Sequence, residues 1–162
     1  MPSRDDFSFK KKPSGLFKWF LKAPQWIFRL KLGFLMGDRF LLLTHTGRKS
    51  GSTFRTPLEV VVHDGDTGEY IVCSGTGPTA DWWLNIHANP ATSIQVRNAV
   101  WTPRQRFLEP EEAARRFHEY ETAHPTTAAR LLDSMGQSHD GTDDDRVRMM
   151  EKIPMVSFGS AG

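Results

Sequence analysis

The 162-residue sequence has one cysteine, Cys73, and six histidines that are spread along the chain. A single cysteine excludes a disulfide within the chain and a zinc site built from several thiolates, and it is typical of a reducing compartment. The histidines form no His-x-x-x-His pair or other ligand spacing, so we expect no metal site. Hydrolytic chemistry is poorly supported, because no nucleophile has an obvious base beside it in the sequence.

An excess of charge of one sign is also missing. The 21 basic and 19 acidic residues leave a net charge of +2, and the basic residues do not gather in one long run, which argues against nucleic acid as a partner. No apolar run reaches the roughly 18 residues that a transmembrane helix needs. Residues 1–6 lack the basic and apolar regions of a secretion signal, so we expect a cytoplasmic protein.

The length is that of one domain with a core of its own. We expect residues 39–162 to form this domain and residues 1–38 to form an arm and an amphipathic helical extension. Apolar residues recur every three or four positions from Leu16 to Phe34, with lysines on another face. Two interpretations remain open: the helix packs on the domain and roofs a pocket, or residues 14–36 contact the inner face of a membrane as a peripheral anchor.

The rest of the sequence predicts a mixed α+β domain with mainly antiparallel strands. The hydrophobic pattern and the turn residues predict strands at 40–44, 55–63, 69–74, 93–96, 100–107 and 155–158. The same criteria predict helices at 81–88, 110–124, 126–135 and 143–152. Strands 93–96 and 100–107 are expected to form one hairpin, and Asp143–Asp145 are expected to cap the last helix.

A cationic glycine turn joins the first two predicted strands. Gly47 and Gly51 permit backbone shapes that other residues resist, and Arg48, Lys49 and Ser50 lie between them. Consecutive backbone N–H groups beside two cations suit a phosphate or carboxylate, although an ordinary solvated turn is the alternative. The order Gly-x-x-x-x-Gly-Lys-Ser/Thr is absent, so this is not a P-loop.

Three further segments have features of a binding site. Ser74-Gly-Thr-Gly77 follows a strand, and its glycines allow close approach to a ligand, although an ordinary turn is the alternative. Pro57 is unfavourable in a central strand and indicates an edge or a bulge. Trp82 and Asn85 fall on one face of a short helix, whereas Trp83 suits either the site or the core.

These segments, in this order, resemble the deazaflavin-dependent nitroreductase family, whose members bind coenzyme F420 on a split β-barrel. The resemblance is carried by residues 47–51, 56–58, 72–77, 82–85 and 153–158. It implies an α+β split barrel with flanking helices and an N-terminal amphipathic helix. It also implies a cofactor site formed by Arg48, Lys49 and Ser50 for the acidic tail, Thr56, Pro57, Leu58, Ser74, Gly75 and Thr76 around the ring, and Asp81, Trp82, Trp83 and Asn85 for the middle, with Arg55 as a further cofactor-binding candidate.

The sequence departs from this pattern at two places. Relatives often carry an arginine where this chain has Phe54, and Arg55 is displaced by one position, which changes the face of a strand. The segment 124–129 lacks the tyrosines that nitroreductases place near their substrate, so we do not expect nitroimidazole reduction. His124 is either a proton donor near the substrate or a partner of the helix dipole.

We therefore expect a deazaflavin-dependent oxidoreductase that transfers hydride between reduced coenzyme F420 and a small hydrophobic acceptor such as a quinone, an enone or a lipid-like molecule. One alternative is a split-barrel reductase that binds flavin mononucleotide (FMN), because the same turn suits its phosphate. A second alternative is a non-catalytic lipid- or cofactor-binding module at the membrane surface.

Overall fold

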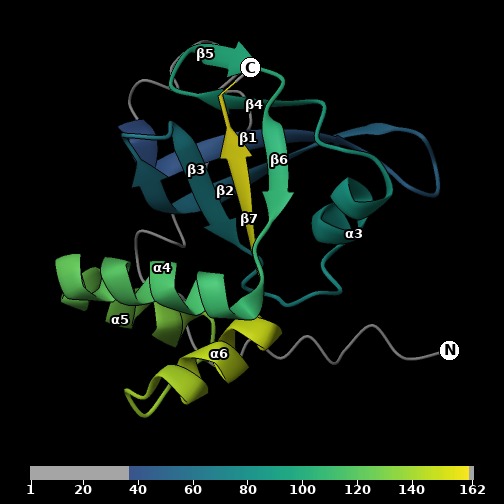
Figure 1. Cartoon of the computed structure of the whole chain (residues 1–162). Helices are drawn as coiled ribbons and strands as arrows, with labels where there is room; N and C mark the ends of the chain where they lie inside the picture. Colours follow the sequence, from purple (N-terminus) through teal and green to yellow (C-terminus); the bar gives the residue numbers. More distant parts are fainter. Residues whose placement is uncertain (1–36, 161–162) are drawn as a thin grey trace, which may run out of the picture.

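The computed structural model describes residues 37–160, so the predicted arm and amphipathic helix lie outside the described residues except for Gly37 and Asp38. The sheet has seven strands in the order β5-β4-β1-β2-β3-β7-β6, and every neighbouring pair is antiparallel. The elements are η2 (Gly37–Arg39), β1 (Phe40–Thr46), β2 (Thr53–Asp64), β3 (Glu69–Cys73), α3 (Asp81–Ala88), β4 (Ser93–Val96), β5 (Ala99–Trp101), β6 (Arg104–Phe107), α4 (Pro110–Ala123), α5 (Pro125–Ser134), α6 (Asp143–Lys152) and β7 (Met155–Gly159). The α+β prediction is confirmed. Helices α4, α5 and α6 gather at one end of the curled sheet, and α3 lies apart from them (Figure 1).

The sheet curls because its two edge strands are consecutive in the sequence. The prediction of a single strand at 100–107 is wrong: β5 pairs with β4, and β6 pairs with β7 at the other end of the strand order. Only Thr102 and Pro103 connect them, and this linker spans at most about 10 Å. Pro103 cannot donate a ladder hydrogen bond, which favours a break there. Trp101 Nε1 also donates to the carbonyl of Gly159 in β7 at 3.0 Å, so the open sheet is nearly closed into a split barrel.

Two groups of buried side chains hold the sheet. One lies between the sheet and helices α4, α5 and α6 and includes Ile71, Phe117 and Met150. The other includes Leu41, Leu43, Trp83 and Ile86 and packs α3 against the sheet. Strand β1 is central in the sheet, since β2 and β4 pair with it on both sides, and Leu41 and Leu43 of its apolar run are buried in the second group.

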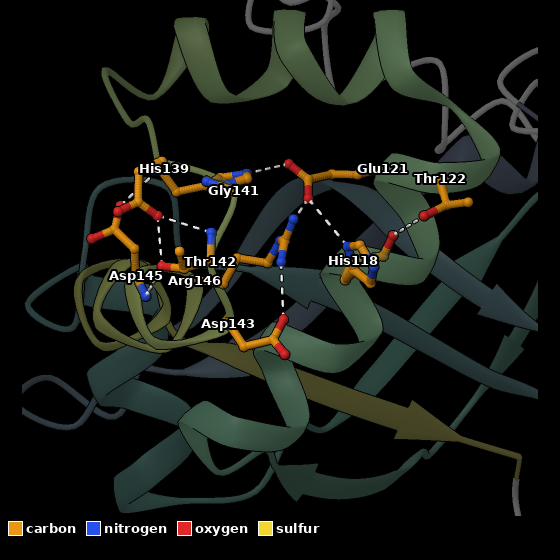
Figure 2. A network of polar contacts seen from close by, with 10 residues as sticks. His118, Glu121, Thr122, His139, Gly141, Thr142, Asp143, Asp145 and Arg146 are labelled. Atoms are coloured by element: carbon orange, nitrogen blue, oxygen red, sulfur yellow. Dashed lines mark hydrogen bonds and ion pairs between the residues drawn. The ribbon is translucent and has the colours of Figure 1, made fainter.

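A polar network joins helices α4 and α6 and the loop before α6 (Figure 2). Arg146 of α6 is 7% exposed, and its Nε donates to Glu121 Oε2 of α4 at 2.9 Å. The other carboxylate oxygen of Glu121 contacts His139 in the loop between α5 and α6. The predicted cap at 143–145 is corrected by one position, because the side chain of Thr142 accepts from the N–H of Asp145. Within residues 37–160 no helix has the length and hydropathy to cross a membrane.

Candidate functional site

A cleft of about 740 Å³ opens beside the cationic turn. Its walls come from the end of β1, the turn, the beginning of β2, the loop before α3, and α3 itself. The lining residues are His45, Gly47, Arg48, Lys49, Ser50, Phe54, Arg55, Thr56, Thr76, Thr79, Ala80, Asp81, Trp82 and Asn85. The structure therefore brings the turn and the tryptophan helix together, as the resemblance implied.

The cleft lies at an edge of β2 that pairs with no strand among residues 37–160. Residues 53–59 of β2 pair with β1, and pairing with β3 begins only at Val60, next to an irregularity in the register. Pro57 falls in this singly paired part, in agreement with the edge predicted from its missing N–H. A strand end with one free side exposes both backbone groups and side chains. Phe54 and Arg55 both line the cleft for this reason, so the one-residue displacement does not remove Arg55 from it.

The two turn glycines meet different requirements. Gly51 has a φ of +70°, which other residues adopt only with strain, and its N–H donates to the carbonyl of Gly47 at 2.8 Å. A Cβ on Gly47 would lie 2.7 Å from Phe54 Cε2 and 2.7 Å from Ser50 Oγ. Gly47 thus lets the aromatic ring lie against the backbone of the turn.

Arg48 is fixed to α3 rather than free in solvent. Its backbone N–H and its Nη1 both donate to Asn85 Oδ1, at 3.0 and 2.9 Å. Its Nη2 forms an ion pair with Asp81 Oδ1 at 3.1 Å, although the Asp81 side chain is 87% exposed. Asp81 is the first residue of α3, so its carboxylate lies at the N-terminus of that helix. With Lys49 and Arg55, the cleft has three cations against one acid.

His45 is a site residue that the sequence did not reveal. It is 2% exposed, and Asn85 Nδ2 lies 3.1 Å from its Nδ1. Its Nε2 lies 2.9 Å from Thr56 Oγ1. Burial lowers the pKa of His45 below its ordinary value. Its partners are 40 and 11 positions away, so no local pattern could have indicated this arrangement.

Other predicted site residues lie beside the cleft without lining it. Trp83 belongs to the core, where its ring packs edge-on against Phe107, while Trp82 lines the cleft. Leu58 is also buried in the core. The hydroxyl of Ser74 donates to the carbonyl of Gly77, and Gly75 packs on Met135. Of the two segments predicted around the ring, residues 56–58 and 74–76, the lining members are Thr56 and Thr76.

His124 lies in a second cleft, of about 520 Å³, and not beside the turn. The residues that line it are Asp38, Arg39, Glu59, Val60, Val61, Val62, His63, Glu119, Tyr120, Ala123, His124 and Thr127. Burial raises the pKa of Glu59, and Arg39 opposes this effect. Burial also raises the pKa of Tyr120, whose ring lies 5.5 Å from that of His124. Strand β2 connects the two clefts, since positions 56 and 59 are about 10 Å apart along a strand.

A nearly closed antiparallel barrel with a cationic cleft at a free strand edge defines a split-barrel cofactor-binding protein. Residues 22–133 match the F420H(2)-dependent quinone reductase family, and the chain belongs to that family. It is thus a deazaflavin-dependent oxidoreductase whose cofactor is coenzyme F420, as the resemblance implied.

Two solved structures are similar to this chain. One, described as an F420-H2 dependent reductase (FDR-A), is 25% identical with a TM-score of 0.49 over 75% of this chain and 95% of that chain. Another, described as a domain-swapped dimer, is 24% identical with a TM-score of 0.50 over 89% of this chain and 99% of that chain. The similarity to the second of these structures supports the fold described above.

Proposed function

We propose that the cleft beside the turn binds coenzyme F420 and that a quinone-type acceptor binds in the second cleft. One observation carries this proposal: three cations and one acid lie at one end of a cleft whose other walls include the flat side chain of Trp82 and a free strand edge. The bound coenzyme supplies hydride, and the chain supplies anion binding, orientation and an apolar place for the acceptor.

The acidic tail of the coenzyme fits the turn. Lys49 and Ser50 are exposed at its tip, and no acid among the described residues forms an ion pair with Lys49. Arg48, held by Asn85 and Asp81, contributes positive potential and fixes the turn. Each charge-assisted hydrogen bond to phosphate or carboxylate contributes about 1.5–3 kcal/mol, so two or three of them would dominate binding of the tail.

The ring fits the free edge of β2 and the loop after β3. Thr56 and Thr76 offer hydroxyl groups there, while Pro57, Leu58, Ser74 and Gly75 would act through their backbone. Trp82 and Asn85 of α3 border the middle of the same cleft. The buried position of Trp83 gives it a supporting part, since it packs beneath Trp82 with an edge-on ring contact.

The second cleft suits a hydrophobic acceptor. Val60, Val62 and Ala123 give it an apolar wall, and the groups that can hold a proton there include Tyr120, His124 and Glu59. A hydride and a proton together convert a quinone to a hydroquinone. Because its raised pKa keeps the proton on Glu59 to a higher pH than usual, this carboxyl joins His124 as a candidate donor.

Cofactor binding is tested by titrating the full-length protein with F420 and with FMN and following the cofactor's absorbance and fluorescence. We expect saturable binding of F420, oxidation of reduced F420 on addition of a water-soluble quinone, and much weaker binding of FMN. Lys49→Ala and Arg55→Ala should each weaken F420 binding about tenfold, in contrast to the exposed Arg130→Ala control. Equal affinity for both cofactors, or equal affinity in all variants, would overturn the proposal.

Peripheral membrane contact through residues 14–36 remains a separate proposal, supported by the basic amphipathic pattern of that segment. Co-sedimentation of the full chain with anionic and neutral vesicles tests it. The double variant Lys18→Glu/Lys22→Glu should lose binding to the anionic vesicles. If the wild-type protein binds neither kind of vesicle, the segment has no such function.

A further inference from the structure

A series of hydrogen bonds connects Arg48, Asn85, His45 and Thr56 in that order. Only one assignment of donors and acceptors is consistent along the whole series. An arginine guanidinium and a backbone N–H can only donate, so the Asn85 atom that faces Arg48 must be the carbonyl oxygen. The amide nitrogen of Asn85 therefore faces His45, and it too can only donate. These donors fix the orientation of the Asn85 amide.

The direction continues through the imidazole ring. Because Asn85 Nδ2 donates to His45 Nδ1, that nitrogen has a lone pair and no proton. The neutral ring then has its proton on Nε2, which donates to Thr56 Oγ1 at 2.9 Å. The lowered pKa of the buried His45 agrees with a neutral ring.

The hydroxyl of Thr56 ends this series. Its oxygen accepts from His45, which leaves its own hydrogen to be donated elsewhere. Thr56 lines the cleft, and no acceptor for this hydrogen is found among the described residues. An oxygen of a bound ligand would complete the network.

We propose that His45 is a positioning residue that makes the Thr56 hydroxyl a hydrogen-bond donor to an acceptor oxygen of the bound coenzyme. This inference rests on the proposed function of the cleft. The acceptor belongs either to the phosphate end or to the ring of the coenzyme, and both supply oxygen acceptors. His45 acts through Thr56 and does not itself touch the ligand.

Protonation of His45 would break the network. Its Nδ1 would then carry a hydrogen directed at the Asn85 amide nitrogen, and turning that amide over would direct its nitrogen at Arg48. The charged groups that line the cleft together with His45 are Arg48 and Lys49 of the turn, Arg55 of β2 and Asp81 of α3. Three of these four are cations, which also disfavour an imidazolium. Affinity for the coenzyme should thus fall as the pH drops through the lowered pKa of His45, below its ordinary value of 6.5.

Two substitutions at position 45 distinguish the roles of the two ring nitrogens of His45. Gln places an amide N–H near the position of Nε2, and Asn places a carbonyl oxygen near the position of Nδ1. His45→Gln should keep the bond to Thr56 and most of the affinity, whereas His45→Asn should lose this bond and weaken F420 binding about tenfold. Both variants bury a similar polar group, so thermal unfolding of the two provides a check for loss of fold.

The experiment is a fluorescence titration of the full-length protein with two ligands. One is F420, and the other is the same deazaflavin ring system without the acidic tail, called here the tail-less deazaflavin. Thr56→Val should weaken binding about as much as His45→Asn, Thr56→Ser should restore it, and the double variant His45→Asn/Thr56→Val should be no worse than either single one. A loss confined to F420 assigns the acceptor oxygen to the tail, and a loss with both ligands assigns it to the ring.

Three results would overturn the inference: additive losses in the double variant, equal affinity of the His45→Asn and His45→Gln proteins, or no recovery with Thr56→Ser. A decline in affinity at acid pH should occur in the wild type and be absent from His45→Gln, which has no titrating group at this position. Failure of the wild-type protein to bind F420 at any pH would instead refute the proposed function of the cleft.

Discussion

Arg48 and Asn85, 37 positions apart in the sequence, are joined twice through one oxygen. The backbone N–H and the Nη1 of Arg48 both donate to Asn85 Oδ1, at 3.0 and 2.9 Å. This contact locks the cationic turn to α3, and Asn85 is itself buried. The relative position of the two halves of the cleft thus depends on this buried amide, together with the ion pair between Arg48 and Asp81.

Replacing this amide should loosen the turn. Asn85→Leu keeps the volume but leaves the backbone N–H of Arg48 and the Nδ1 of His45 without their partner, which costs about 1–3 kcal/mol of unfolding free energy. Urea denaturation measures this loss, with the exposed Asn89→Ala as the control. An Asn85→Leu protein as stable as the control would show that the contact contributes little.

Gly47 should be sensitive to a single methyl group. Gly47→Ala directs a Cβ at the ring of Phe54 and at the hydroxyl of Ser50, each 2.7 Å away, and should lower stability by about 1–3 kcal/mol. Because Phe54 is partly exposed, part of this cost should be relieved in Gly47→Ala/Phe54→Ala. Chemical denaturation of the four proteins of this cycle measures the coupling. Purely additive costs would contradict the packing of the ring on Gly47.

Glu59 should make stability depend on pH. Burial raises its pKa, so the folded state binds the proton more tightly than the unfolded state does. Stability contributed by the neutral carboxyl is present at low pH and declines as the pH rises from the ordinary glutamate pKa through the raised one. Glu59→Gln should therefore raise the Tm at about pH 7 and leave it nearly unchanged at about pH 4. The exposed Glu111→Gln provides the comparison, and an equal Tm gain at both pH values would contradict the assignment.

The ion pair between Glu121 of α4 and Arg146 of α6 should stabilise the fold only while both partners are present. Glu121→Ala leaves the buried guanidinium of Arg146 without its main partner and should cost about 3–5 kcal/mol. Glu121→Ala/Arg146→Met removes the charge as well and should recover much of this loss. Thermal unfolding of both proteins decides the matter. A double variant less stable than Glu121→Ala would mean that Arg146 stabilises the fold through contacts other than the ion pair.

Local signals predicted most of the elements, and long-range contacts explain the differences. The helix at 81–88 and the strand at 93–96 have the predicted bounds, because alternation and turn residues define them within a few positions. The division into β5 and β6 depends on pairing with strands that are distant in the sequence. The predicted helices 110–124 and 126–135 leave out Pro125, yet Pro125 begins α5, since proline suits the first turn of a helix.

In the candidate site, too, local sequence signals predicted the segments, and long-range contacts decided the details. The turn and the tryptophan helix could be predicted because each has a distinctive short sequence. Spacing alone put Trp82 on the same helix face as Asn85, and both line the cleft. The sequence left Trp83 open between the site and the core, and its packing against Phe107 places it in the core. The separation of His124 from the turn likewise depends on how α4 is placed against β2.

The most direct test of the central claim compares the affinities of F420 and of the tail-less deazaflavin for the wild-type protein and for Lys49→Ala/Arg55→Ala. The account predicts that the wild type prefers F420 by at least about tenfold, and that the double variant loses this preference while binding the tail-less ligand as before. A preference that survives both substitutions would place the acidic tail away from the cationic turn and contradict the account.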